Sequence, residues 1–210
     1  TNQGMRAFDP ERQSYSMGIR LVRLAHSAWR HSSLAPVARP YIEALSAKVG
    51  EAVHLAQFDN GHVLFVDKCK ATDNFETLAQ AGKIAPGYCT GVGKAILAFL
   101  PEVKQNRALD QQSYTAHTPF TLTDRAALVA ELTKIKSTGV AYDREEHEQG
   151  IISIACPILT GQGRVVGAVS IASSTNRYTI DDLEKQRPNL LKSANLIGSE
   201  AELWQAPTWS

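Results

Sequence analysis

The stretch GVAYDREEHEQGIISIACPILTGQGRVVGAVSIA, residues 139–172, decides the fold of this chain. It holds two apolar runs, residues 151–159 and 164–172, which are rich in β-branched residues and are bounded by glycine. The turn TGQG at residues 160–163 joins them at the length of a hairpin loop, so the sequence predicts paired antiparallel strands. An acidic connection, residues 143–150, precedes the first strand. We therefore expect a sheet with charged residues at one end.

The first of these strands has two unlike faces, because side chains alternate across a strand. One face is uniformly apolar or nearly so, which predicts a core packed against helices. Its members are Ile152, Ile154, Cys156 and Ile158. The opposite face is smaller and more polar, which suits the floor of a ligand pocket. It carries Ile151, Ser153, Ala155 and Pro157, and the partner strand adds Val166, Ala168, Ser170 and Ala172. We expect Ser153 and Ser170 to offer hydroxyl groups to a ligand.

Composition limits the class of protein. A chain of 210 residues with 43% hydrophobic residues can bury the core of one ordinary domain plus an appendage. The 22 Lys and Arg residues against 21 Asp and Glu leave no basic surplus, which argues against DNA contact by most of these residues. With no membrane-length apolar run and no signal peptide, we expect a soluble, cytoplasmic protein. The three cysteines lack metal-ligand spacing and fit a reducing compartment, and we expect no metal or cofactor.

The N-terminal part of the chain predicts helices. Residues 1–14 are polar and contain Gly and Pro, so we expect a tail or loop there. Apolar residues recur at helical spacing over residues 15–29, which predicts a helix with one apolar face. A second helix is expected at about residues 34–49. Its signals are Ser32 or Ser33 as N-cap, Pro36 in the first turn and Gly50 as the stop.

Turn and cap residues predict the remaining elements. Asn60-Gly61 accepts the positive φ of a tight turn, so residues 52–58 and 62–69 are expected to form a second hairpin. We also expect a strand at about residues 75–80 and helices at 94–100, 124–136 and 180–203, the second capped by Thr123 and the last kinked at Pro188. Strands that arrive in hairpins, with helices before, between and after them, predict an antiparallel α+β domain.

The glycine-rich segment GYCTGVGK, residues 87–94, opens a predicted helix. It has a superficial likeness to a phosphate loop, but Ala95 stands where the Walker pattern needs a hydroxyl group for Mg²⁺. Backbone amides of Gly91, Val92 and Gly93 at a helix start can hold a carboxylate without any metal. The alternative is a tight turn that only packs a helix closely onto the sheet.

Together, residues 139–172 and the segment GYCTGVGKAILAFLP at residues 87–101 resemble the effector-binding domain of the IclR family of bacterial transcriptional regulators. The segment Tyr15-Ser16-Met17-Gly18 is similar to the family's Y-x-x-G segment, which follows the wing of a winged helix and begins a linker helix. The resemblance implies a GAF- or PAS-like curved antiparallel sheet that holds a small molecule on one face.

The same resemblance implies a domain plan and partners. Residues 1–14 are expected to be a remnant of the wing, 15–32 the linker helix and 33–210 the sensor domain, with the DNA-binding helix-turn-helix absent from this chain. The resemblance implies a small organic effector, which we expect to be a carboxylate, and assembly as a homodimer or tetramer. Operator DNA is expected to be bound only through the N-terminal domain.

The resemblance also implies an effector site formed by the glycine-rich segment, the acidic connection and the two hairpins. Its expected members are Cys89, Thr90, Gly91, Val92, Gly93, Asp143, Ser153, Ser170, Phe75, Thr77, Tyr88 and His54. Asp143 is expected to act by hydrogen bonds or by excluding poorly matched anions. Glu145, Glu146 and His147 are expected to be mainly structural, as charge runs usually are. His54 has a second interpretation, as an interior residue with a satisfied hydrogen bond.

Two other functions compete with the sensor. A GAF-like redox enzyme would use Cys89 or Cys156 as its nucleophile, but no partner base is evident and Cys156 alternates onto the core face. A pure oligomerisation module would use the helix that begins near Tyr15, which is compatible with a sensor. We therefore expect a non-enzymatic sensor.

Overall fold

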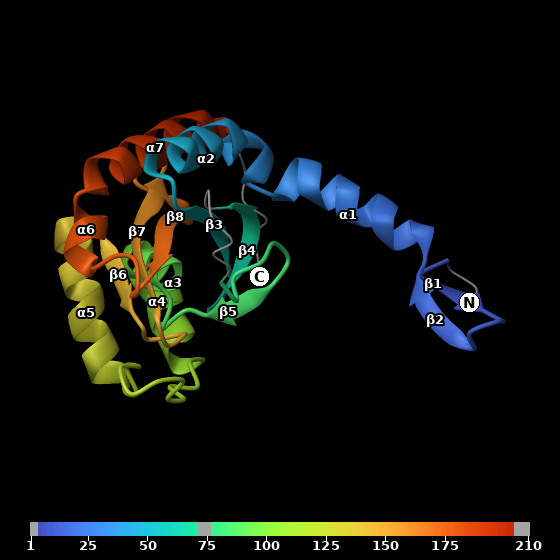
Figure 1. Cartoon of the computed structure of the whole chain (residues 1–210), viewed down its shortest axis with the longest axis horizontal. Coiled ribbons are helices and arrows are strands. Elements are labelled where there is room, and N and C mark those ends of the chain that lie inside the picture. Colours follow the sequence, from blue (N-terminus) through green and yellow to red (C-terminus); the bar gives the residue numbers. More distant parts are fainter. Residues whose placement is uncertain (1–3, 71–76, 204–210) are drawn as a thin grey trace.

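A six-stranded antiparallel sheet forms the centre of the computed structural model, which describes residues 4–70 and 77–203 (Figure 1). The strand order is β5-β4-β3-β8-β7-β6, so the two predicted hairpins lie side by side and pair through β3 and β8. The strands are β3 (Ala52–Asp59), β4 (His62–Cys69), β5 (Ile84–Pro86), β6 (Ala141–Arg144), β7 (Ile151–Leu159) and β8 (Val165–Ser174). The predicted α+β fold class is confirmed.

Helices cover both faces of the sheet (Figure 1). One face packs against α2 (Ala35–Val49), α6 (Ile180–Glu184) and α7 (Arg187–Glu200), whereas the other packs against α3 (Gly91–Phe99), α4 (Glu102–Asp110) and α5 (Arg125–Thr138). The apolar face of β7 lies in the core beneath α2 and α7, as predicted from its alternation, and Ala155 faces the α3 side. The smaller, more polar face of the sheet is therefore the one that meets the start of α3.

A β-bulge corrects the prediction for one strand. Ile158 pairs with Gly167 and Leu159 pairs with Val165, which leaves Val166 as an extra residue in β8. Val166 therefore packs into the core on the α2 side, although Ala168 lies on the opposite face. The expectation that these two residues share a face was wrong, because period-two alternation holds only up to a bulge.

The N-terminal expectations also need correction. Residues 1–14 are not simply a tail, because β1 (Arg6–Asp9) pairs with β2 (Ser14–Met17) in a separate hairpin. Tyr15 belongs to β2, where its ring contacts that of Phe8 at 5.1 Å between centroids. The helix α1 (Ile19–Ser32) begins four residues later than predicted and projects from the part of the chain that contains the six-stranded sheet, with the hairpin at its far end (Figure 1).

Local capping signals were predicted with mixed success. The N-cap of helix α2 is Leu34, so the expectation of Ser32 or Ser33 was wrong, although the N–H of Ala35 donates to the Ser33 hydroxyl at 3.1 Å. Gly50 ends the helix with φ of 73°, as expected. The tight turn after β3 has positive φ at both Asn60 and Gly61, as expected. Thr179 caps α6 in a reciprocal capping box with Asp182.

Other boundaries differ from the predictions. Helix α5 is capped by Asp124 rather than Thr123, and α3 starts at Gly91, three residues early, because Thr90 caps it. The expected strand at 75–80 is absent over its described part, residues 77–80, and the edge strand is β5 instead. The final helix is broken before Arg187, so Pro188 lies in the first turn of α7 instead of kinking a continuous helix. Within residues 4–70 and 77–203, every helix is too short or too polar to cross a bilayer.

Candidate functional site

A small cavity of about 40 Å³ lies between the sheet and the N-terminus of α3. Eight of the twelve residues predicted from the sequence line it: His54, Thr77, Thr90, Gly91, Val92, Asp143, Ser153 and Ser170. Strand register brings them together, because Asp143 pairs with Ser153 across β6 and β7, and His54 pairs with Ser170 across β3 and β8. The cavity therefore collects polar groups from four strands and one helix start.

The start of α3 presents two backbone donors to this cavity. The Thr90 hydroxyl accepts the N–H of Gly93 at 3.2 Å, which satisfies one donor of the first turn. The N–H groups of Gly91 and Val92 have no hydrogen-bond partner within the described part of the chain. Gly93, predicted as part of the site, does not line the cavity, so two free amides remain where three were expected.

Gly91 allows the helix start to approach the hairpin closely. A Cβ atom at this position would lie 2.7 Å from Ser153 Oγ and 3.5 Å from the backbone N of Asp143. Ser153 is buried, and its hydroxyl forms no hydrogen bond with any described residue. Ser170 contributes a second unpaired hydroxyl from the adjacent strand. The unpaired donors of α3 and these hydroxyls thus face one small volume.

The opposite end of the cavity is formed by His54 and Thr77, and the hydroxyl of Thr77 also accepts a hydrogen bond from the charged Nζ of Lys68 at 3.3 Å. His54 is 3% exposed, and its Nε2 is hydrogen-bonded to Thr77 Oγ1 at 3.1 Å. Burial, with the charge of Lys68 adding, lowers the pKa of His54 to about 3, so its imidazole is neutral. Phe65 lines the cavity beside it, with ring centroids 5.7 Å apart. His54 is therefore both a satisfied interior residue and part of the cavity wall.

Asp143 is the buried carboxyl group of the site. Its Oδ1 accepts the N–H of Glu146 at 2.8 Å. Burial and, to a smaller extent, the nearby charge of Glu146 together raise the pKa of Asp143 to about 7, against the opposing effects of Lys94 and of backbone hydrogen bonds. Near neutral pH, Asp143 is therefore present partly as a protonated carboxyl group, which can donate a hydrogen bond, and partly as a carboxylate, which can only accept one.

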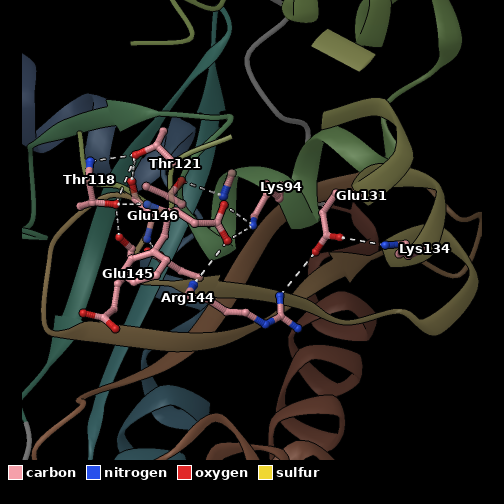
Figure 2. A network of polar contacts seen from close by, with 12 residues as sticks. Lys94, Thr118, Thr121, Glu131, Lys134, Arg144, Glu145 and Glu146 are labelled. Atoms are coloured by element: carbon pink, nitrogen blue, oxygen red, sulfur yellow. Dashed lines mark hydrogen bonds and ion pairs between the residues drawn. The ribbon is translucent and has the colours of Figure 1, made fainter. Parts of the chain in front are cut away.

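A fully buried lysine, which the sequence prediction did not include, holds the acidic connection in place (Figure 2). The Nζ of Lys94 lies 2.5 Å from Oε1 and 2.6 Å from Oε2 of Glu146, and both side chains are nearly inaccessible. Because this ammonium group is already paired, it is not free to bind a phosphate as the lysine of a phosphate loop does. The sequence signal was a single lysine within the otherwise apolar helix GVGKAILAF.

Two threonine side chains form hydrogen bonds with the backbone of the same acidic connection (Figure 2). The Thr118 hydroxyl donates to the carbonyl of Glu145, and the Thr121 hydroxyl donates to that of Glu146, each at 2.6 Å. On the cavity side, the carboxylate of Glu148 accepts the N–H of Leu78 at 3.1 Å. The acidic connection therefore forms a wall that reaches across to residues 77–80.

His147 and Glu148 also line the cavity, which the sequence reasoning missed. His147 was expected to be mainly structural, yet it is half-buried in the wall of the cavity. Burial, with His117 adding, lowers the pKa of His147. Nothing in the local sequence distinguishes these two residues from their charged neighbours, because the connection turns at Glu145, whose φ is 61°.

Of three further residues predicted for the site, two do not line the cavity and the third lies outside the described residues. Tyr88 is fully buried, and its hydroxyl donates to the carbonyl of Thr115 at 2.6 Å rather than facing the cavity. Cys89 is also buried, and burial raises the pKa of its thiol to about 12. Phe75 lies outside the described residues. No group of three or more potential metal ligands is found in the described ranges.

Comparison with known proteins agrees with this architecture. Residues 26–199 match the family model described as "Bacterial transcriptional regulator IclR C-terminal". The chain is 31% identical over 176 residues to the HTH-type transcriptional regulator XynR of Escherichia coli (strain K12), covering 84% of this chain and 69% of that protein.

Solved structures give the same result. The Thermotoga maritima IclR structure matches with a TM-score of 0.83 and 27% identity, covering 96% of this chain and 81% of that one. The inducer-binding domain of PobR from Acinetobacter, a double mutant in complex with 3-hydroxybenzoic acid, matches with a TM-score of 0.74 and 26% identity, covering 80% and 99%. This chain therefore belongs to the IclR family of bacterial transcriptional regulators and contains its C-terminal effector-binding domain.

Proposed function

We propose that the cavity at the start of α3 binds a small organic acid, and that its occupancy modulates DNA binding by an N-terminal winged helix. The observation that carries the proposal is the meeting of the free Gly91 and Val92 amides with the unpaired Ser153 hydroxyl. Helix N-terminal amides favour an anion through both hydrogen bonding and the helix dipole. A carboxylate is the anion that fits without a metal or a free cation.

The electrostatics of the cavity support a monoanion held by neutral donors. Lys94 is the cation at the start of α3, and Glu146 neutralises it. A bound carboxylate would favour the protonated form of Asp143, because a second negative charge nearby raises the pKa of an acid. Asp143 would then donate a hydrogen bond to the effector instead of repelling it.

The cavity dimensions support a small and partly hydroxylated effector. At about 40 Å³, the cavity has room for about three water molecules at 10–15 Å³ each, so a larger effector requires the wall to move. His54, Thr77 and Ser170 supply hydrogen-bonding groups away from the amides. A hydroxyl or carbonyl oxygen distant from the carboxylate would pair with them. The 3-hydroxybenzoic acid bound by the Acinetobacter domain carries both groups.

For the domain plan, we propose that residues 1–14 belong to a wing, whose last strand runs on to Met17, that residues 15–32 lead from it to the sensor and that residues 33–210 are the sensor. The helix α1 exposes Ile19, Val22, Leu24 and Trp29, which supports assembly into a homodimer or tetramer through this helix. Such a regulator would work in the cytoplasm, where its operator lies.

A redox enzyme is the weaker alternative. Burial raises the pKa values of Cys89 and Cys156 to about 12, so almost no thiolate nucleophile exists near neutral pH. A pure oligomerisation module does not account for unpaired donors around a cavity. We therefore propose a non-enzymatic sensor.

A thermal-shift screen of small organic acids, followed by calorimetry on each hit, tests the proposed function. We expect a saturable rise in melting temperature with hydroxylated monocarboxylates and none with the matching amides, which lack the negative charge. A ligand without any acidic group that binds this cavity would contradict the anion part of the proposal.

A further inference from the structure

A second concave site lies on the α4 side of the domain. This groove has a volume of about 160 Å³ and shares no lining residue with the effector cavity. Its floor is apolar and combines side chains from four elements. They are Phe58 of β3, Ile96 of α3, Ala108 of α4 and Val165 of β8, with Leu100 following α3.

The rim of the groove is positively charged. Lys104 and Arg107 lie one turn apart on α4 and line its mouth. Both are exposed, and neither has a hydrogen bond or ion pair with any described residue. Among the described residues, no Asp or Glu lines the groove, whereas Asn60 and Gln111 do. An apolar floor beneath two unpaired cations is complementary to an anion with an apolar body.

We infer that this groove is a second small-molecule site, which binds a monocarboxylate carrying an apolar body the size of one aromatic ring or a short acyl chain. The size limit follows from the volume, since an apolar protein cavity of about 150 Å³ holds benzene. The carboxylate would lie between Lys104 and Arg107, and the apolar body against Phe58 and Ile96.

The position of the groove connects it to the joint between the linker helix and the sensor. Gln57 lines the groove and also fixes that joint. Its Oε1 accepts the N–H of Leu34 at 2.7 Å, and its Nε2 donates to the carbonyl of Ser32 at 3.2 Å. A ligand in the groove would therefore contact β3 at the residue that holds the end of α1, while α3 runs from the groove floor to the effector cavity.

Calorimetric titration of the full chain with octanoate tests this inference, with backbone amide NMR to locate the ligand. We expect saturable binding of one octanoate per chain, with amide shifts in α4 and in the turn at Asn60-Gly61. Replacing both cations, K104E with R107E, should weaken binding roughly tenfold or more, because two attractions become two repulsions. Octylamine, which has the same apolar body with the opposite charge, should not bind there.

Two matched variants complete the design. K192E reverses an exposed lysine on α7, and S153A alters the effector cavity; octanoate affinity should be unchanged in both, so this result stands apart from the proposed effector function. If the charge-reversed variant does not fold, the neutral pair K104Q with R107Q should still weaken binding. Absence of saturable binding, amide shifts confined elsewhere, or equal affinity in the cation variants would overturn the inference. So would loss of an oligomer in K104E/R107E without octanoate binding to the unmodified chain, since the groove would then be a protein interface.

Discussion

Lys94 and Glu146 form an ion pair that is buried on both sides and joins the first turn of α3 to a connection 52 residues later in the chain. The pair lies close to the cavity at the start of α3, because Gly91 and Asp143, its near neighbours in sequence, both line that cavity. Burying two charges is costly, and the pair offsets this cost only when both partners are present. We therefore expect the loss of one partner to appear first as a lower free energy of unfolding.

Replacing Lys94 with Met should reduce the free energy of unfolding by about 3–5 kcal/mol, because Glu146 would be left buried without a counter-charge. Adding Glu146→Leu in the same chain should recover much of the loss. Lys134→Met is the matched control, since Lys134 is exposed and lies 3.9 Å from Glu131, and it should cost less than about 1 kcal/mol. Urea denaturation measures all three. Equal costs for Lys94→Met and Lys134→Met would show that the buried pair contributes little.

Ser153→Ala should weaken effector binding by about ten- to a hundredfold, which corresponds to the 1.5–3 kcal/mol of a hydrogen bond to a charged group. The fold should survive, because alanine keeps the strand packing. Ser173→Ala is the matched control: Ser173 lies on the neighbouring strand, is fully buried and has no hydrogen-bond partner for its hydroxyl. Calorimetry with a ligand from the acid screen should find its affinity unchanged. Unchanged affinity in Ser153→Ala with an intact fold removes Ser153 from the site.

Gly91→Ala should destabilise the domain by about 1–3 kcal/mol, because the new Cβ would overlap Ser153 Oγ. In the Ser153→Ala background this atom is gone, and the cost of Gly91→Ala should fall. A double-mutant cycle by thermal denaturation should therefore give a coupling of about 1 kcal/mol. Additive costs would mean that the close approach of helix and hairpin is relieved by movement elsewhere.

Asp143→Asn should change how stability depends on pH. Folding raises the pKa of Asp143 from 3.8 to about 7, so between these values the unfolded state binds fewer protons and stability falls as pH rises. Asparagine removes this titration while its Oδ1 can still accept the N–H of Glu146. Relative to the unmodified chain, the variant should gain at most roughly 4 kcal/mol between pH 4 and pH 7.5, at 1.36 kcal/mol per unit. Parallel curves of unfolding free energy against pH would contradict the raised pKa.

Self-association through α1 should depend on its exposed apolar residues. Ile19 and Val22 are 81% and 45% exposed, so a glutamate at each position should leave the monomer fold intact. Sedimentation at micromolar concentration should find a dimer or tetramer for the unmodified chain and a smaller species for the double variant. An unmodified chain that sediments only at its monomer mass of 22.9 kDa would contradict the prediction.

The sequence predicted the features that depend on near neighbours. The Asn60-Gly61 turn, the helix end at Gly50 and the two faces of β7 all follow from short-range chemistry, and the structure confirms them. Helix α4 was missed because it is mostly exposed and has no apolar repeat at helical spacing. The β1–β2 hairpin was missed because its strands are only four residues long and almost entirely exposed, and because residues 15–17 were assigned to the helix that follows.

The features of the site that join residues far apart in the sequence could not be predicted from the sequence alone. The Lys94–Glu146 pair joins residues 52 apart, and no local pattern indicates which of the four acidic residues in DREEHE lies beside the lysine. The bulge at Val166 shifts one residue to the other face, and Gly167 beside it is a general signal for a bulge that does not say which residue is displaced. His147 and Glu148 reach the cavity only because the connection turns sharply at Glu145.

The pairing of β3 with β8 also determines when the cavity can form during synthesis. His54 lies opposite Ser170, so this part of the cavity cannot form until the ribosome has made a strand more than a hundred residues later in the chain. Until that strand emerges from the ribosome, β3 keeps an open edge that can pair with other chains. Contacts of such large sequence separation slow folding, so a nascent chain is expected to gain its binding capacity only when the domain is almost entirely translated.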